Sequence, residues 1–548
     1  MSKFKVKFKI KFQVLVLVAI VTFICIEEAT FSLNGSYDTR MDVMRSRADH
    51  LTHTDNGQGN QEFWQSVFDL YNENKITEDE RSWIQLKPGM SRNFGKSRKS
   101  LLKRCTIKEE HLKAIQEKHS NIVENLPNEL APSTYKKGSR GIVIIGGGFF
   151  SWLSMLTIVQ LRELGSELPI ELVLPNQSDY NENLCEVELP KYNDKCMIIS
   201  DVLGLNETAL NLQKYQYKGI ALLANSFQHV FLLDSDNFPV TNIDKYFDSP
   251  VYKDHNMVLW PDYWKRSIYP LYYDIAKIPV TINKQTRVGT LPLIDPIDLT
   301  QREASAATFH DLDGAIPDFS TESGQLLVNK RTHGKMLLLA LYYNILGPDA
   351  YYKLFSLGAR GEGDKDTFPA AALATYSTFY QVKSYISSFN LELDNGEIKG
   401  TAMGQHDPQL DYELYNTEYE KLRNDPENQG KNLKQQTEIL SNFYKEHFFK
   451  VEKVPIFSVH CHIWKIDPAD YLNRKEIYDN GSNRLKKRMY NSFKYKNEDQ
   501  EIDFELQRWK IANKLACEDR IPFTNFENTD MDRVCQFMKN TIDWLKGN

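Results

Sequence analysis

One stretch near residue 150 constrains the fold of this chain more than any other. Ile142–Ile145 is an apolar, β-branched run, and Gly146-Gly147-Gly148 follows it directly. A helical pattern then covers Ser151–Leu164, and a second apolar run occupies Ile170–Leu174. The order strand, glycine turn, helix, strand is that of a βαβ unit, so the sequence predicts a parallel sheet.

Strands and helices continue to alternate beyond this unit. We predict an amphipathic helix at Gln213–Phe227, a buried strand at Val230–Leu233 and a fourth strand at Met257–Leu259. The fold class is therefore α/β, with a sheet that begins near residue 138. The last seventy or so residues look mainly helical.

The glycine turn after the first strand permits two interpretations. A G-x-G-x-x-G motif would need glycine where Ser151 stands, and an acid where Pro175 and Asn176 follow the second strand. A dinucleotide fingerprint therefore does not fit. Gly146 and Gly147 either let a nucleotide approach the backbone or make a tight strand-to-helix turn.

An acidic motif follows the third strand. Asp234 and Asp236 form one of four D-x-D sequences in the chain, and it alone comes directly after a buried apolar strand. Ligands of open α/β sheets bind at the carboxyl ends of strands, and two carboxylates there can hold Mn²⁺ or Mg²⁺. Such an ion neutralises a diphosphate leaving group. The alternative is a turn in which both aspartates cap backbone amides; we favour the metal site.

Composition excludes some classes of protein. Lys and Arg number 67 against 73 Asp and Glu, a net charge of −6, whereas nucleic-acid-binding domains usually carry a basic excess. Hydrophobic residues make up 41% of the chain, which is enough for a large core. The seven cysteines include no C-x-x-C pair, and the six beyond Cys25 allow up to three disulfides in an oxidising lumen.

The N-terminus has the pattern of a membrane signal. Five lysines between Lys3 and Lys11 precede an apolar run, Phe12–Ile26, and two glutamates follow it. Positive charge stays in the cytosol, so the rest of the chain is expected in the lumen. The run is short for an anchor, but a cleaved signal peptide would need small residues before the cut, and no good site follows. We favour an uncleaved anchor in a type II topology.

Four N-x-S/T sequons follow this signal. They lie at Asn34, Asn176, Asn206 and Asn480. Together with the anchor and the cysteines they are typical of the secretory pathway.

Three segments resemble a known family. Gly141–Pro175, Lys218–Pro239 and Trp260-Pro261-Asp262 are similar to fungal mannosyltransferases of the MNN type, most of all to the α-1,2 branch. Members of that family are type II Golgi proteins that add mannose from GDP-mannose to branches of cell-wall mannan. The resemblance covers roughly residues 138–470. It implies a GT-A glycosyltransferase fold, a nucleotide-binding α/β domain with a metal-binding D-x-D.

On this interpretation the chain has five parts. They are a cytoplasmic tail (1–11), a transmembrane signal anchor (12–30), a luminal stem with an N-terminal helical region (31–137), a GT-A catalytic domain (138–470) and a C-terminal helical region (471–548).

The resemblance also assigns residues to the donor and to the metal ion. Donor-binding residues are expected at Gly146, Gly147, Lys218, Asp234, Asp236, Asp262 and Lys465. His460 would join the two D-x-D carboxylates on the metal, although His462 stands where the family commonly has asparagine and is the alternative ligand. The simpler interpretations are a core histidine at His460 and a solvent-facing helical charge at Lys218.

Two further motifs are expected on the acceptor side. Glu322 lies in Thr321–Gln325, which either faces the sugars or forms an exposed turn before a strand. Asp364 and Asp366 lie in Gly361–Phe368, and one of them could simply cap the helix that follows. The resemblance makes all three carboxylates candidates for orienting the acceptor or stabilising positive charge.

The expected reaction is a metal-dependent, retaining transfer of mannose from GDP-mannose, in α-1,2 linkage, to an α-mannoside acceptor on N-linked mannan. Retention can use a carboxylate nucleophile or same-face attack by the acceptor hydroxyl, and the sequence does not choose between them. One alternative is an α-1,3-mannosyltransferase or a related glycosyltransferase of the same fold. Another is a non-catalytic Golgi protein that binds mannan.

Overall fold

The computed structural model describes residues 58–205, 212–449 and 453–547. The predicted tail, the anchor and the sequons at Asn34 and Asn206 lie outside these residues. Within the described part, no helix has both the length and the hydropathy that crossing a membrane requires. Residues from Asn60 onward form one compact unit. The helices before residue 138 therefore belong to the same unit as the predicted catalytic domain.

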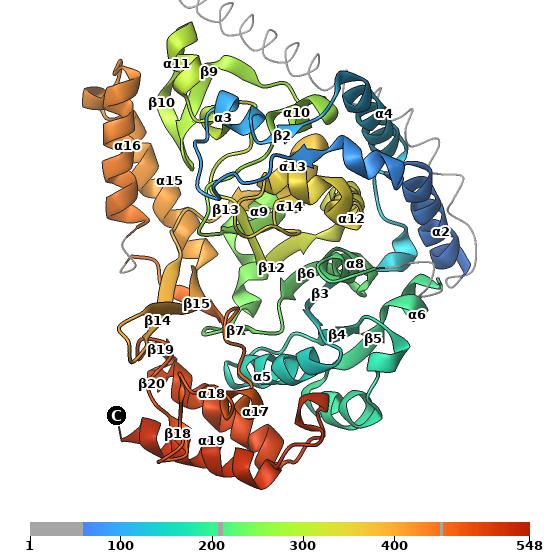
Figure 1. The fold of residues 1–548 in the computed structure, drawn as a ribbon, viewed down its shortest axis with the longest axis vertical. Coiled ribbons are helices and arrows are strands. Elements are labelled where there is room, and N and C mark those ends of the chain that lie inside the picture. Colours follow the sequence, from blue (N-terminus) through green and yellow to red (C-terminus); the bar gives the residue numbers. More distant parts are fainter. Residues whose placement is uncertain (1–57, 206–211, 450–452, 548) are drawn as a thin grey trace, which may run out of the picture. The chain divides into compact units, whose positions relative to one another are not determined.

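A seven-stranded sheet organises this unit (Figure 1). In order across the sheet, the strands are β13 (Tyr380–Gln381), β8 (Met257–Pro261), β12 (Thr321–Asn329), β6 (Phe227–Leu233), β3 (Lys136–Ile145), β4 (Ile170–Leu174) and β5 (Lys195–Ile198). The β3, β4, β5 and β6 strands pair in parallel, whereas β12 runs antiparallel between β6 and β8. The sheet is thus mixed, and the predicted βαβ unit forms its parallel half.

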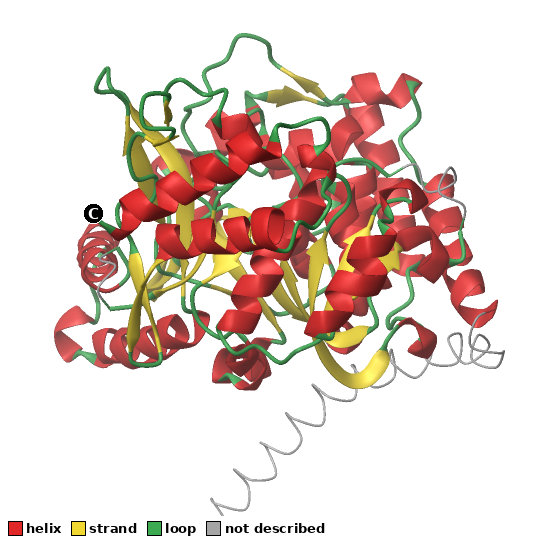
Figure 2. Ribbon diagram, turned by 90° about the horizontal axis from the view of Figure 1, so that it is seen from below, coloured by secondary structure: helices red, strands yellow, loops and turns green. Residues whose placement is uncertain are grey.

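Helices cover both faces of this sheet (Figure 2). On one face, Val143 of β3 packs in a core with α8 (Gln216–Ala224). On the other, Ile142 and Ile144 pack with α5 (Phe149–Glu163). Successive side chains of a strand point to opposite faces, so one apolar strand supplies both cores.

Most predicted elements are confirmed. The α5 helix corresponds to the one predicted at residues 151–164, and β8 to the fourth strand. The α8 helix ends earlier than predicted because the Asn225 side chain accepts a hydrogen bond from the Phe227 amide. Thr321–Gln325 was expected to precede a strand, but it lies inside β12 and is buried, so the exposed-turn alternative is wrong.

A second, four-stranded antiparallel sheet brings distant residues together. Its strands are β14 (Ser387–Glu392), β15 (Ile398–His406), β16 (Ile456–His460) and β7 (Asn237–Pro239). The chain enters β7 directly after the D-x-D motif, and His460 of β16 pairs with Asn237. The Cys461 amide also donates to the Asp236 carbonyl oxygen at 2.9 Å. This pairing places the end of β16 against the D-x-D turn.

Further elements pack around the two sheets. The helices α2 (Gln58–Glu73) and α4 (Glu109–Asn125) join the core that contains α8. The β9 (Thr281–Val288), β10 (Leu291–Asp298), α15 (Pro408–Asn424) and α16 (Leu433–His447) elements share a small core of their own. The C-terminal region contains α18 (Phe504–Asn513) and α19 (Met531–Lys546), together with the short strands β17 (Tyr478–Asp479), β18 (Arg484–Leu485), β19 (Lys494–Asn497) and β20 (Gln500–Asp503).

Four of the six cysteines beyond the N-terminal run form disulfides. Cys185 bonds to Cys196 of β5, and Cys517 bonds to Cys535 of α19. Cys105 and Cys461 are free and buried. The count is within the predicted maximum of three.

Candidate active site

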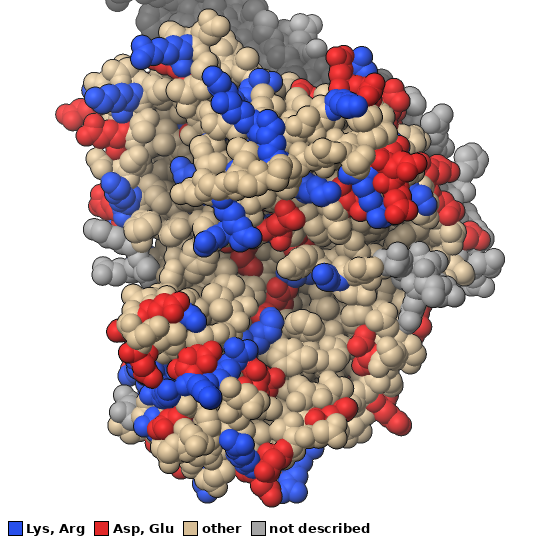
Figure 3. Space-filling model, viewed as in Figure 1, with Lys and Arg blue, Asp and Glu red and all other residues tan. Residues whose placement is uncertain are grey.

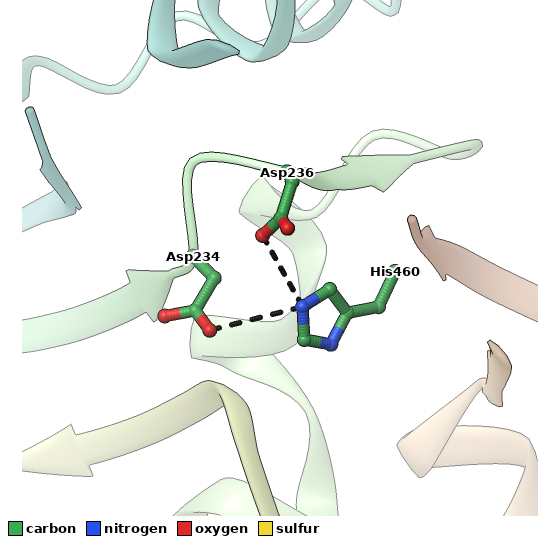
Figure 4. A group of neighbouring side chains, drawn as sticks. All are labelled: Asp234, Asp236 and His460. Carbon is green, nitrogen blue, oxygen red and sulfur yellow. Dashed lines mark ion pairs between the residues drawn. The ribbon is translucent and has the colours of Figure 1, made fainter. Parts of the chain in front are cut away.

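The D-x-D motif lies at the carboxyl end of β6, as predicted. Backbone bonds hold its turn: the Asp234 amide donates to Gly324 of β12 at 2.8 Å, and the Asn237 amide donates to the Asp234 carbonyl at 3.0 Å. The two carboxylates do not cap this turn. They face the imidazole of His460 instead (Figure 4).

Asp234, Asp236 and His460 are the one group within the described ranges that could hold a metal ion. One ligand atom from each lies within 4.8 Å of the others. Nε2 of His460 is 3.2 Å from an Asp236 oxygen and 3.8 Å from an Asp234 oxygen. Adjacent ligands of an octahedral Mg²⁺ ion lie about 3 Å apart. Two carboxylates and one imidazole at these separations fit Mn²⁺ or Mg²⁺.

Glu322 of β12 lies behind the histidine. Its Oε1 atom is 3.1 Å from Nδ1 of His460, and its carboxylate also accepts hydrogen bonds from the Gly324 amide and the Gln325 side chain. A carboxylate on the far nitrogen orients a metal-binding histidine and leaves the other nitrogen for the ion. The structure therefore gives Glu322 a place behind the metal group, where the sequence had suggested contact with the sugars.

His462, the alternative ligand, is outside the group. The β16 strand ends at His460, and the His462 ring packs beside it with Nδ1 3.2 Å from the His460 carbonyl oxygen. The structure thus brings together the predicted ligand His460 and the two aspartates.

The site is strongly acidic. Burial disfavours a charged His460, but the carboxylates of Asp236 and Glu322 overcome it and raise the pKa of the imidazole to about 10. Burial also disfavours a charged Asp236, yet His460 and Lys465 hold the pKa of that carboxyl well below its usual range. A field that keeps a buried imidazole protonated also favours a divalent cation in the same place.

Both lysines predicted to bind the donor contact the aspartates. Lys218 of α8 donates to Asp234 at 2.8 Å and to the Ser323 carbonyl at 3.1 Å, so it is a residue of the site and not a solvent-facing helical charge. Lys465 forms an ion pair with Asp236. The Lys465 side chain is 33% exposed and that of Lys218 13%, so Lys465 is the more accessible to a ligand.

The glycine turn borders the same site. Gly147 has a φ of 94°, and a Cβ there would lie 2.9 Å from the Asp179 side chain, so the turn itself requires glycine. The Lys465 ammonium lies 5.4 Å from the centre of the Phe150 ring, at the start of α5. A Cβ at Gly146 would meet the Leu172 side chain at 2.8 Å. Contact of Gly146 and Gly147 with a nucleotide stays a prediction.

Asp262 follows β8 as Asp234 follows β6. Its amide donates to the Ser320 carbonyl at 2.7 Å, and its carboxylate pairs with Lys365. Burial raises the pKa of Asp262, and the Lys365 charge opposes this. Lys365 stands between the two acids of the predicted acceptor motif, where the sequence gave it no separate role.

Asp366, at the N-cap of α14 (Thr367–Ala374), is fully engaged by the protein. It accepts hydrogen bonds from Arg266 at 2.6 Å, the Thr321 amide at 2.9 Å and the Ser320 hydroxyl at 3.0 Å. Arg266 is fully buried and was not predicted, because nothing in the sequence Tyr-Trp-Lys-Arg marks a buried charge. These contacts link α14 to the start of β12.

Asp364 is buried but only partly engaged. Its Oδ1 atom accepts from the Ser323 hydroxyl at 3.0 Å, while Oδ2 has no hydrogen-bond partner in the described part of the chain. Burial raises the pKa of Asp364; Lys218 lowers it, and the Asp234 charge raises it further. Of the two acids in this motif, Asp364 is therefore the one with an oxygen that the described part of the protein leaves without a hydrogen-bond partner.

Two predicted sequons lie on described residues. Asn480 is exposed beyond β17. Asn176 is half-buried, with its amide 3.3 Å from Asp179. Asn480 is therefore the more accessible acceptor for a glycan.

Comparison with known proteins identifies the class and then the family. A family model described as a mannosyltransferase matches residues 139–407. The α-1,2-mannosyltransferase MNN23 of Candida albicans is 41% identical over 510 residues, which are 88% of this chain and 84% of that protein. MNN22 of the same organism is 42% identical, with 88% and 85% covered. MNN2 of Saccharomyces cerevisiae is 35% identical, with 82% and 77% covered.

The matched proteins are glycosyltransferases. The chain belongs to their family, the α-1,2-mannosyltransferases of the MNN type. This confirms the resemblance inferred from the sequence.

Proposed function

We propose that the chain transfers mannose from GDP-mannose, in α-1,2 linkage, to an α-mannoside acceptor of N-linked mannan. The observation that carries this proposal is the Asp234, Asp236 and His460 group at the carboxyl end of β6. The names of the relatives support the sugar and the linkage. The mixed sheet with antiparallel β12 supports the finer assignment to the GT-A fold.

A Mn²⁺ or Mg²⁺ ion held by these three residues would neutralise the diphosphate leaving group. Glu322 keeps His460 oriented for that role through its bond to Nδ1. Lys465, the more exposed lysine beside Asp236, supplies a further positive charge for the diphosphate. Lys218 is deeper and holds the Asp234 carboxylate in place.

Asp364 is the carboxylate that we assign to the sugar. GDP-mannose is an α-linked donor, so an α-linked product means retention and positive charge develops on the mannose ring. A buried carboxylate oxygen with no protein partner can stabilise that charge, and Asp364 provides one. Asp366 is excluded from this role because the protein already engages both of its oxygens.

We also propose that the chain is a type II Golgi membrane protein with its catalytic part in the lumen. The lysine-rich N-terminus, the apolar run and the two disulfides support a secretory location. Removal of N-glycans should shift the mobility of the full chain on a gel, and Asn480→Gln should remove one part of that shift. A chain without any glycan would contradict the luminal orientation.

The test of the activity uses the purified full chain with GDP-mannose and an α-mannobioside acceptor. Transfer should occur with Mn²⁺ and stop with EDTA, and NMR of the product should show an α-1,2 linkage. An α-1,3-linked product would contradict the proposed linkage but would still show that the chain is a mannosyltransferase. A folded chain that does not bind GDP would refute the proposal.

A further inference from the structure

We propose that a row of aromatic side chains beside the catalytic centre binds an extended acceptor, an α-linked mannose oligosaccharide of several residues. The aromatic row consists of Trp264, Tyr263, Tyr385, Phe319 and Phe449. This inference rests on the proposed function and adds to it the acceptor's length and the surface that holds it.

The aromatic row begins at the catalytic centre. A Cβ placed on Gly361 would lie 3.1 Å from an Asp262 carboxylate oxygen and also 3.1 Å from a Trp264 ring carbon. Asp262 in turn precedes Trp264 by two residues and pairs with Lys365 of the acidic motif. Trp264 is 37% exposed, so its ring forms part of the rim of the site.

Contacts link Trp264 to the other members of the row, through the rings everywhere except between Tyr263 and Tyr385. The Trp264 and Tyr263 ring centres are 6.4 Å apart, and the Tyr385 hydroxyl donates to the Tyr263 carbonyl at 3.3 Å. Tyr385 then lies 5.3 Å from Phe319 and stacks on Phe449 at 5.4 Å with 22° between the ring planes. The two exposed rings, Trp264 beside the site and Phe449 at the far end, are thus connected through half-buried rings.

Four separate loops supply these side chains. Tyr263 and Trp264 follow β8, Phe319 precedes β12, Tyr385 precedes β14, and Phe449 follows α16. Because β12 is antiparallel to β8, the end of β8 and the start of β12 meet at one edge of the sheet. This edge also carries the metal-binding carboxylates. Figure 3 shows a hollow across the middle of the face in view, with acidic side chains in it.

Two members of the aromatic row, Trp264 and Phe449, are exposed, and the other three are half-buried. Phe449 is 56% exposed, and exposed apolar surface that is continuous with a site marks an interaction surface. The C–H face of a pyranose ring packs on an aromatic face, and the sugar hydroxyls remain free for polar groups at the edge. Arg360 lies over the Trp264 ring, with its guanidinium 5.6 Å from the ring centre, where it can donate hydrogen bonds to sugar hydroxyls. A sugar chain leading to the catalytic centre therefore fits better than a protein, which would cover the site.

The chain offers a matched control in Tyr376. This side chain is 82% exposed, more than any residue of the aromatic row. It makes no ring contact in the described part of the structure. If exposure of an aromatic ring alone affected acceptor binding, Tyr376→Ala would behave like Trp264→Ala.

The experiment measures KM for a ladder of α-mannose oligosaccharides, from two to six residues, with the purified full chain, GDP-mannose and Mn²⁺. KM should fall about tenfold along the ladder, which corresponds to about 1.4 kcal/mol of added binding free energy. Trp264→Ala should raise KM for every acceptor. Phe449→Ala should raise KM for the longer acceptors only. Tyr376→Ala should not change KM for short or for long acceptors. KM for GDP-mannose should stay the same in all three variants.

Calorimetry without donor separates this inference from the proposed function. Length-dependent binding of the oligosaccharides that Trp264→Ala weakens would support the aromatic row even if GDP-mannose were not turned over. The inference would be overturned if turnover were normal, KM did not depend on acceptor length, and Trp264→Ala had the same KM as Tyr376→Ala. That result would leave the proposed function intact. Trp264→Phe, which keeps a ring, should lie between wild type and Trp264→Ala, and the same melting temperature in all variants excludes misfolding.

Discussion

The chain carries two Asp-x-Asp pairs near the same edge of one sheet, in which all the aspartates but half-buried Asp234 are buried, and the pairs differ in what surrounds their oxygens. Asp234 and Asp236 face cationic side chains, namely Lys218, Lys465 and His460. Asp366, in contrast, is surrounded by hydrogen-bond donors that the fold holds in place, and its neighbour Asp364 keeps one oxygen without a partner.

The same spacing of acids therefore serves different purposes. The partly exposed Lys465 side chain can turn toward a bound ligand, so the Asp236 carboxylate that it neutralises remains available to an ion. An aspartate bonded to a backbone amide and a buried arginine is fixed, because leaving either partner unsatisfied costs stability. Whether an aspartate has a chemical or a structural role therefore depends on the groups that its carboxylate contacts, and not on the D-x-D spacing.

The largest effect is expected at the first pair. Asp236→Ala should lower transfer by about 10³-fold or more, since it removes a ligand of the metal that neutralises the leaving group. Initial rates with GDP-mannose and a mannobioside acceptor measure the loss, and electron paramagnetic resonance measures Mn²⁺ binding, which should weaken as well.

Asp532→Ala is the matched control, because it changes an exposed aspartate in another D-x-D sequence of this chain. It should leave both the rate and Mn²⁺ binding unchanged. If the two variants had equal transfer rates, Asp234 and Asp236 would have no special role in the reaction.

Asp364→Asn should have the next largest effect on the rate. The substitution keeps the size of the side chain and its bond to Ser323 but removes the charge at the free oxygen. We expect kcat to fall about 10²-fold, the usual effect of losing one electrostatic contact to a transition state. The KM for GDP-mannose and the melting temperature should change little. A normal kcat would show that the free oxygen of Asp364 is not used.

The sequence predicted the elements that local pattern controls. The βαβ unit and the D-x-D at the end of β6 were found where they were expected. The late histidine, which only the family resemblance implied, lies beside the D-x-D motif. Buried ion pairs between distant segments could not be predicted, since Arg266 and Asp366 meet only after β8, β12 and α14 have packed. The contact of Glu322 with His460 could not be predicted for the same reason, because only the pairing of β16 with β7 brings the two residues together. The expected role of Glu322 beside the sugars stays a prediction.

Glu322→Gln is expected to have a smaller effect than the loss of a metal ligand. Glutamine keeps a polar group near Nδ1 but not the charge, so His460 would be oriented less firmly. Metal affinity should fall about 10–100-fold, the range for such supporting residues. The Kd for Mn²⁺ from electron paramagnetic resonance checks this.

Excess Mn²⁺ distinguishes this positioning role from a direct one. It should restore most of the rate of Glu322→Gln, whereas it should not restore Asp364→Asn. A loss of kcat that persists at saturating Mn²⁺ would mean that Glu322 contacts the sugars, as the sequence had suggested.

Asp366→Asn should have the smallest effect on the rate and the largest on stability. It removes the charge partner of fully buried Arg266, and breaking a buried pair in this way costs about 3–5 kcal/mol. The melting temperature should fall, while kcat at a temperature where the variant is folded should stay within a few-fold of wild type. Thermal unfolding by circular dichroism, together with rates on the same samples, checks both.

Asp313→Asn supplies the matched comparison for this last variant. Asp313 is also ion-paired, but its side chain is 43% exposed and lies 3.9 Å from Lys284. Exposed pairs of this kind contribute about 0–1 kcal/mol, so its melting temperature should hardly move. If Asp366→Asn instead kept its stability and lost its activity, both acids of the second pair would serve the reaction. Hydrogen bonds from the protein to a carboxylate would then not distinguish a structural aspartate from a catalytic one in this fold.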